Sequence, residues 1–421
     1  MHFRAFIKTL SKVLMPGQLV SRLSSSMRTR SAEESLAIVA PFARERGVSR
    51  VVDTTWLDNV GIPVYASIRP DGQDGTLWVH AGKGFTHAEA KIGAYMEAIE
   101  FSYAEPGHSE IDWFMSTPRE ILQSFNGGIG LADFCAHIGR TAVLDGPISA
   151  VWGEEISCGL GRVQLPAELL YVPFRPQGQS LYGTHTNGLA SGNTVQEASV
   201  HALTEVMERH VHSFELLDDK SCFVKLDHLT PKLQEMVRKI EAAGLNAVLR
   251  YSENEFGMAF FSAYVFESEG ATPLTMANGA GFHPVREIAA IRALSEAVQS
   301  RLTFIHGGRE DIIEQYAYFD KLEASTQLKT VAGLRQSISD PAKSIQWDEI
   351  PDFEPVLPSL EDVWELLLVT LRSVDMPYVV RLTLTKTTDP FQVVKVVVPG
   401  AEVFSFDCPR VGPRLLKYFS K

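Results

Sequence analysis

One stretch of the sequence, TVQEASVHALTEVMERH, carries groups that could hold a metal ion. These groups are Glu197, His201, Glu205 and Glu208, at positions i, i+4, i+8 and i+11. In a helix this spacing puts all of them on one face. A solvated acidic face usually interleaves Lys or Arg, and this face has almost none before Arg209. Because like charges repel, the pattern favours a cation or a basic ligand between the carboxylates.

Three kinds of site are consistent with such a helix. A plain solvated face needs no ligand, and Glu and His one turn apart also occur in zinc and iron sites of helical bundles. Oxygen donors outnumber nitrogen donors here, which favours a hard cation, Mg²⁺ before Zn²⁺. Since Mg²⁺ is rarely held by protein ligands alone and usually bridges to phosphates, the pattern also indicates a nucleotide.

The same pattern recurs in two other segments. Glu97, Glu205 and Glu296 align without gaps, and glycines precede every copy. Each copy has an alanine seven residues earlier, another three residues earlier, and an acid or amide three residues later: Ala90, Ala94 and Glu100; Ala198, Ala202 and Glu208; Ala289, Ala293 and Gln299. Two small residues one turn apart let a helix pack closely on its neighbour. Acids from sister helices would therefore converge on one pocket.

The sequence around these residues predicts the helices and strands that position them. Each copy indicates a glycine-rich turn followed by a long helix, with Asn193–Thr194 suited to cap the second and Pro284 to open the third. Apolar, β-branched runs between the helices indicate strands at 51–52, 62–68, 165–172, 258–266, 378–383 and 393–398. We predict an α+β fold, a mixed β-sheet flanked by helices that belong to repeated turn-helix units.

A phosphate contact is also suggested at the first copy. Lys83 stands between two glycines in GKGF, just before a predicted helix N-terminus, where anions bind favourably. The segment lacks the spacing of a P-loop, so it carries little weight alone. An ordinary surface lysine is the alternative.

Composition limits the class of protein. The chain has 421 residues and a formal net charge of -12, which argues against a protein that holds nucleic acid. The four cysteines are far apart and lack metal-ligand spacing, which indicates a reducing, cytoplasmic setting. No apolar stretch is long enough to span a membrane.

The two regions outside the repeats differ in character. Residues 1–30 contain no acid and six Lys or Arg. We predict them to be an amphipathic arm, docked on a partner or packed on the chain's own domain, with apolar positions at Phe3, Phe6, Ile7, Leu10, Val13 and Leu14. Residues 31–421 are predicted as one large domain, in which 306–360 form a helical insertion or connector.

The three repeated segments resemble the signature blocks of the YcaO family. They read GKGFTHAEAKIGAYMEAIE, NGLASGNTVQEASVHALTEVMERH and GAGFHPVREIAAIRALSEAVQSR, within a likeness from about residue 30 to residue 399. The resemblance implies that 31–421 are a YcaO catalytic domain around an ATP pocket. With Lys83, the implied ATP- and Mg²⁺-binding residues are Glu97, Glu100, Asn193, Glu197, Glu205, Glu208, Glu296, Gln299, Arg301 and Arg309. Glu97, Glu100, Glu197, Glu205 and Glu208 are the expected metal ligands. Gly93 stands where the family has Ser.

The resemblance also implies a reaction. ATP phosphorylates a backbone amide oxygen of a peptide or protein, a nucleophile adds to the amide carbon, and phosphate departs. A neighbouring Cys, Ser or Thr gives an azoline, whereas external sulfide gives a thioamide. The chain ends CPRVGPRLLKYFSK, without the PxPxP tail of azoline-forming members, and RGVSRVVDTTWLDNVGIPVYASIRP resembles the TfuA-associated branch. We therefore favour thioamide formation with a sulfur donor and a TfuA partner over cyclodehydration.

Other functions remain open at this point. Gly93 would suit a non-catalytic scaffold that binds a peptide, but idle like charges in one pocket would be costly to keep. An accessory factor for ribosomal protein modification is a further alternative. Relatives of this kind imply a homodimer.

Overall fold

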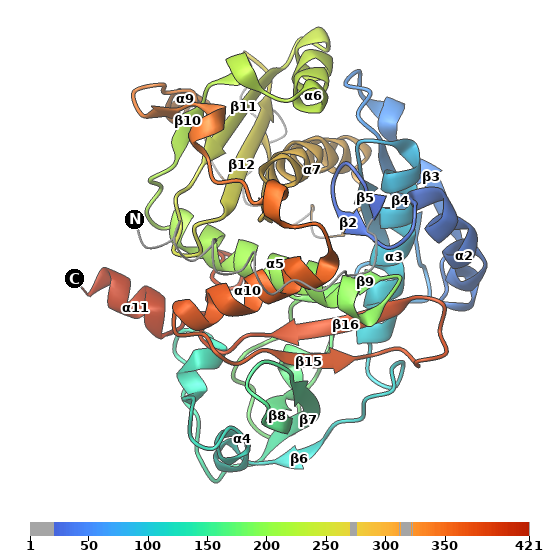
Figure 1. The fold of residues 1–421 in the computed structure, drawn as a ribbon, viewed down its shortest axis with the longest axis vertical. Helices are drawn as coiled ribbons and strands as arrows, with labels where there is room; N and C mark the ends of the chain where they lie inside the picture. The colour runs from blue at the N-terminus through green and yellow to red at the C-terminus, as the bar shows by residue number, and fades with distance from the viewer. Residues whose placement is uncertain (1–20, 270–275, 311, 313–320, 322, 421) are drawn as a thin grey trace.

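Three strands and the helices that follow them set the plan of the fold (Figure 1). The pairs are β5 (Val79–Lys83) with α3 (His87–Ala104), β9 (Leu189–Gly192) with α5 (Val195–Glu215), and β13 (Met276–His283) with α7 (Arg286–His306). The computed structural model describes residues 21–269, 276–310, 312, 321 and 323–420. The three helices coincide with the three repeated sequence segments.

Glycine and alanine let each helix lie directly on the strand before it. A Cβ added to Gly82 would lie 2.1 Å from the Ala90 carbonyl oxygen, and one on Gly281 would lie 2.1 Å from that of Ala289. A Cβ on Gly192 would lie 2.5 Å from the backbone nitrogen of Ala198. No real Cβ fits at such distances. All six repeated alanines are fully buried, so the repeat is a structural device for close helix–strand contact.

The strands form separate sheets that are mostly antiparallel. One has the order β13-β12-β11-β10-β14, another β6-β7-β15-β16-β9 with β8 beside β7, and a third β3-β4-β5. Thus β5, β9 and β13 are all edge strands of the described sheets. The other strands are β1 (Ser21–Arg22), β2 (Met27–Arg28), β3 (Arg50–Asp53), β4 (Val64–Ile68), β6 (Phe114–Ser116), β7 (Ile148–Glu155), β8 (Gly161–Pro166), β10 (Cys222–Val224), β11 (Asn246–Tyr251), β12 (Ala259–Phe266), β14 (Ser344–Ile345), β15 (Val380–Thr383) and β16 (Gln392–Val397).

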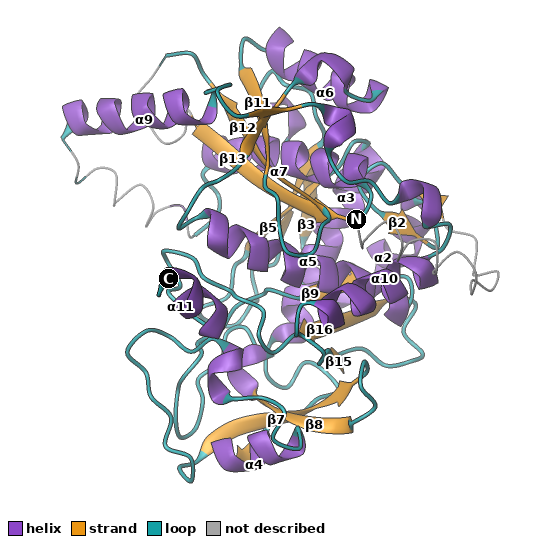
Figure 2. Cartoon of the chain, turned by 60° about the vertical axis from the view of Figure 1, so that its left-hand side comes forward, coloured by secondary structure: helices purple, strands orange, loops and turns teal. Residues whose placement is uncertain are grey.

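The remaining helices cover these sheets and form the outer layers. They are α2 (Ala32–Glu45), α4 (Pro118–Ser124), α6 (Pro231–Ala242), α9 (Ala324–Ile338), α10 (Leu360–Ser373) and α11 (Pro413–Phe419). In Figure 2, α7 lies against the sheet of β11 to β13, and α10 runs beside α5 above β15 and β16. Met207 of α5 and Leu367 of α10 share one buried cluster with Val394 of β16. The helix that carries most of the acidic face is therefore anchored in the core.

The predicted α+β class is confirmed, with differences in detail. The predicted strand at 165–172 is wrong beyond Pro166, because Ala167–Leu169 turn into a short 3-10 helix. Within 306–360 the chain forms α9, and β14 adds a parallel strand beside β10. The apolar positions of the predicted arm, from Phe3 to Leu14, lie outside the described residues.

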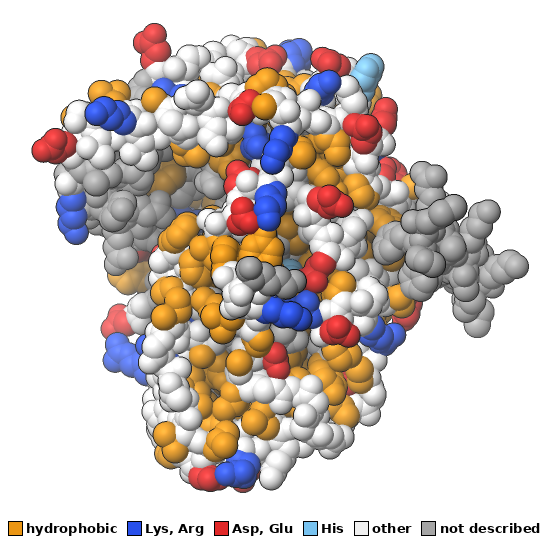
Figure 3. Space-filling model, turned by 90° about the vertical axis from the view of Figure 1, so that its left-hand side faces the viewer, with side chains coloured by type: hydrophobic (Ala, Val, Ile, Leu, Met, Phe, Trp, Pro, Cys, Tyr) orange, Lys and Arg blue, Asp and Glu red, His pale blue; other side chains and the backbone are white. Residues whose placement is uncertain are grey.

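The surface carries charged side chains of both signs. Figure 3 shows acidic and basic side chains interspersed on one face, around patches of hydrophobic side chains. In the part of the chain that the structure describes, no helix is both long enough and apolar enough to cross a membrane.

Candidate active site

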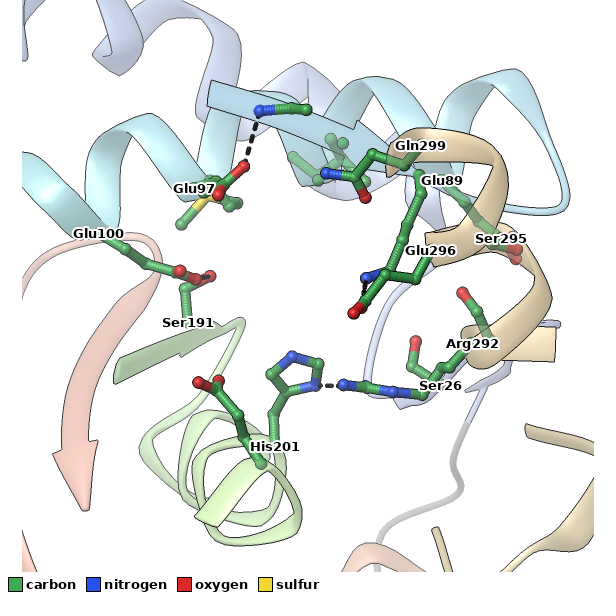
Figure 4. Close-up of a pocket in the computed structure, with 18 of the residues that line it drawn as sticks. Ser26, Glu89, Glu97, Glu100, Ser191, His201, Arg292, Ser295, Glu296 and Gln299 are labelled. Carbon is green, nitrogen blue, oxygen red and sulfur yellow. Dashed lines mark hydrogen bonds and ion pairs between the residues drawn. The ribbon is translucent and has the colours of Figure 1, made fainter. Parts of the chain in front are cut away.

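A cavity of about 720 Å³ lies between the three repeated helices. In Figure 4, Glu97 and Glu100 enter it from α3, His201 from α5, and Glu296 from α7. Its volume is in the range of small-molecule sites. The wall is completed by the three edge strands and by residues of the β1–β2 hairpin.

Most of the residues singled out from the sequence line this one cavity. They are Lys83, Glu97, Glu100, Asn193, Glu197, Glu205, Glu208, Glu296, Gln299 and Arg309. Arg301 is the exception, because it is not among the residues that line the cavity. Its Nε lies 2.6 Å from Asp58 Oδ2 and its Nη2 lies 3.0 Å from Glu267 Oε1, away from the cavity. Arg301 lies on a different face of α7 from Glu296, and Asp58 and Glu267 hold its side chain on that face.

The carboxylates of α3 and α5 crowd one another. The backbone N–H of Ala81 donates to Glu97 Oε2 at 2.7 Å, and the Ser191 hydroxyl donates to Glu100 Oε1 at 2.5 Å. Burial, together with the carboxylates of Glu205 and Glu97, raises the pKa of Glu100 to about 8, although the Ser191 hydrogen bond lowers it. Burial and then the adjacent Glu208 raise the pKa of Glu205 to about 7. A divalent cation would remove both the burial penalty and the repulsion.

The third helix brings compensating positive charge. Lys83 donates to Glu296 Oε2, and the Ala280 N–H lies 3.4 Å from the other carboxylate oxygen. Burial alone would raise the pKa of Glu296, but Lys83, Arg292 and the Ala280 N–H together hold that pKa below its usual value. The predicted phosphate contact, Lys83, thus lines the cavity with a carboxylate partner already beside it.

Arg292 is a cavity residue that the sequence reasoning missed. Its Nη1 donates to His201 Nδ1 at 3.3 Å, its Nη2 lies 4.0 Å from Glu208 Oε2, and its Nε has no partner among the described residues. Burial lowers the pKa of His201 well below its usual value, so this imidazole is neutral. The guanidinium therefore keeps donors for an anion. The signal was present: Arg292 lies four residues before Glu296, on the same helix face.

Glu197 has an environment unlike that of a metal ligand. Its Oε1 accepts from Arg28 Nη1 at 3.0 Å and from the Asn193 N–H at 3.0 Å, and its Oε2 accepts from the Thr29 N–H at 2.8 Å. Asn193 also donates through Nδ2, while its Oδ1 accepts from Ser35. Burial alone would raise the pKa of Glu197, but Arg28 and these donors hold it below its usual value. Protein donors thus fill both oxygens of Glu197 in this structure, and its metal role stays a prediction.

Comparison with known proteins decides the family. The family model described as YcaO cyclodehydratase, ATP- and Mg²⁺-binding, matches residues 81–402. The chain belongs to the YcaO family. It is 34% identical over 373 residues to an uncharacterized protein of Methanothermobacter thermautotrophicus, covering 88% of this chain and 93% of that one. Over 394 residues it is 26% identical to a Rhizobium leguminosarum bv. trifolii protein described as lying in the tfuA 3′ region, covering 89% of each.

The fold of this YcaO chain agrees with a solved structure. The YcaO of Methanopyrus kandleri bound with AMPPCP and Mg²⁺ superposes with a TM-score of 0.73 at 24% identity, covering 94% of this chain and 98% of that one. Family membership makes ATP and Mg²⁺ the cofactors and places the chain among ATP-dependent peptide-modifying enzymes. The cavity fits them, since it combines carboxylates whose pKa values are raised with two donors, Arg292 Nε and Ser295 Oγ, that have no partner in the part of the chain that the structure describes.

Proposed function

We propose that this YcaO protein uses ATP to phosphorylate a backbone amide oxygen of a peptide or protein, and that the product is a thioamide. The observation that carries the proposal is the single cavity in which crowded carboxylates face a guanidinium with spare donors. Carboxylates suit Mg²⁺, and a guanidinium suits phosphate. An ATP-using phosphoryl transfer is the chemistry that needs both.

The residues divide between the two tasks. We assign metal binding to Glu97, Glu100, Glu205 and Glu208, which face the cavity from α3 and α5. Bound Mg²⁺ would neutralise charge on the transferring phosphoryl group. Arg292 would hold the terminal phosphate of ATP, because its Nε and part of its fork lack strong partners. Gln299 and Arg309 line the same cavity, and we assign them to the nucleotide as well.

In the proposed reaction, phosphorylation turns the amide oxygen, a poor leaving group, into a good one. The amide oxygen attacks the terminal phosphorus, the bond to the bridging oxygen breaks, and ADP leaves. Hydrosulfide then adds to the amide carbon, and phosphate departs with the original oxygen while the sulfur loses its proton to solvent, which leaves C=S and an intact N–H. The protein's contribution is positioning and electrostatic stabilisation, which crowded fixed charges in a buried cavity provide.

The choice of sulfide is supported by one relative. The Rhizobium protein that is 26% identical over 394 residues is described by its position in a tfuA 3′ region. A TfuA-type protein that supplies sulfur is therefore the partner we propose, together with a homodimeric state for this chain. Cyclodehydration to an azoline is the second candidate, favoured by the family description as a cyclodehydratase.

Glu208→Gln tests the proposal with a matched control. Its carboxylate also accepts the Phe282 N–H, a bond that the amide oxygen of glutamine can keep. We expect ATP-dependent phosphate release to fall about 10²- to 10³-fold, because the variant loses metal-binding charge. Glu120→Gln, at the capping position of α4 and outside the cavity, should leave release unchanged. Equal release by all three proteins would refute the nucleotide site.

Mass spectrometry of peptide incubated with the chain, Mg·ATP, sulfide and a TfuA-type protein identifies the product. Oxygen-to-sulfur exchange adds the mass difference of those atoms, whereas ring closure removes one water. A dehydrated product would overturn the thioamide assignment and leave ATP use intact.

A further inference from the structure

A short hairpin, residues 21–29, is fastened over the nucleotide cavity at two points. Its strands pair Ser21 with Arg28 and Arg22 with Met27. On one side the Ser24 N–H donates to Glu89 Oε1 at 2.9 Å. On the other side the Thr29 N–H and hydroxyl both donate to Glu197 Oε2 at 2.8 Å. Four residues of the hairpin line the cavity: Leu23, Ser25, Ser26 and Arg28.

The two fastening carboxylates occupy equivalent places in two repeats. Glu89 lies eight residues before Glu97, and Glu197 lies eight residues before Glu205. Each is the third residue of its helix, and its backbone N–H donates to the N-cap threonine. In the third repeat this place is taken by Ile288, which is fully buried. Among the three repeats, a carboxylate at this position thus appears only where the hairpin is held.

The fastening also reaches the metal-binding acids. Arg28 Nη1 donates both to Glu197 and to the Ser191 carbonyl at 2.9 Å. The hydroxyl of the same Ser191 donates to Glu100. Glu89 in turn accepts from the Phe85 N–H at 2.9 Å, so neither carboxylate has a vacant side. The hairpin, both helix N-termini and Glu100 form one connected network.

We infer that Glu89 and Glu197 are positioning residues that clasp the hairpin and thereby close one wall of the nucleotide cavity. Glu197 acts through Thr29 and Arg28, not as a magnesium ligand. The inference rests on the proposed function only in that the cavity holds ATP. Its geometric part, that the two carboxylates hold the hairpin, stands independently of any reaction.

Hydrogen exchange of the full chain without nucleotide tests the geometric part. Glu197→Gln replaces an acceptor oxygen by an NH₂ group that faces the Thr29 donors. We expect exchange in residues 21–29 to accelerate about tenfold, and likewise for Glu89→Gln, since each change removes hydrogen bonds to a charged acceptor. Thr29→Val, which removes only the hydroxyl donor, should give a smaller acceleration. Glu120→Gln, at the same capping position of α4, is the matched control and should not change the hairpin.

Kinetics test the functional part. With the clasp opened, the KM for ATP should rise about tenfold while the Mg²⁺ concentration for half-maximal activity stays unchanged. Glu208→Gln should shift the metal dependence instead. If Glu197→Gln shifts the Mg²⁺ dependence and leaves exchange in the hairpin as it was, Glu197 is a metal ligand and the inference is overturned. If the unaltered chain does not turn over ATP, the proposed function fails, and the exchange data still decide the clasp.

Discussion

The first two repeats and the third share a scaffold but differ in what they present to the cavity. In α3, α5 and α7 the buried alanines and the central glutamates, Glu97, Glu205 and Glu296, recur at the same positions. Four residues before the central glutamate the helices carry Gly93, His201 and Arg292, and eight residues before it Glu89, Glu197 and Ile288. The packing positions are therefore constant, and the positions around the ligand vary.

This difference assigns a separate task to each helix. The first two supply acids and hold the hairpin, whereas the third supplies the guanidinium, and its central glutamate is already neutralised by Lys83. A site for a metal ion and a phosphate needs negative side chains on one side and positive side chains on the other. The three repeats provide both because they differ at the positions four and eight residues before the central glutamate. The repeat explains the fold, and its departures from repetition explain the site.

Arg292→Gln should give the largest effect, because it removes the positive wall. We expect kcat/KM for ATP to fall about 10²- to 10³-fold, and Arg292→Lys to recover only part, since lysine cannot present a fork. His201→Gln changes the equivalent place in the second repeat and should cost about tenfold or less. Steady-state kinetics of the three variants measure the contrast. If Arg292→Gln and His201→Gln lower kcat/KM for ATP equally, the proposal that α5 and α7 have different tasks is wrong.

The sequence revealed the scaffold better than the site. The repeat was legible because alanines at fixed spacing reflect close packing, and it located α3, α5 and α7. The spacing around Glu197 could not show that a hairpin far away in sequence donates to both of its oxygens, because spacing contains no information on such contacts. The sequence could not show that Arg301 pairs with Asp58 and Glu267, because both acids come from distant loops. Long-range partners, not local pattern, decide which helix residues face a ligand.

Gly82→Ala tests whether the shared scaffold depends on strand–helix contact. Its new Cβ would lie 2.1 Å from backbone atoms of Ala90 and Ala94, which cannot move without shifting α3. We expect the free energy of unfolding to fall by about 3 kcal/mol, measured by denaturant titration. Gly93→Ala, within α3, is the opposite case, because its new Cβ would lie 3.4 Å from its nearest neighbour. It should stabilise the chain by up to about 1 kcal/mol through helix propensity. A stable Gly82→Ala variant would contradict this account of the repeat.

The smallest expected effect is a pH dependence that separates the first repeat from the third. Burial raises the folded-state pKa of Glu100 from 4.5 to about 8, so the stability it contributes is lost as pH rises through that value. The pKa of Glu296 is lowered, and its contribution is lost only as pH falls below its usual range. The pKa of Lys395 is lowered to about 7 by burial and opposes the trend, so the comparison is between variants. In metal-free protein, Glu100→Gln should match the parent near pH 4, where Glu100 is protonated in both the folded and the unfolded chain, and exceed its Tm by a few degrees near pH 9. Glu296→Gln should show no such gain in Tm near pH 9, because Lys83 and Arg292 already compensate the charge of Glu296, whereas that of Glu100 is uncompensated.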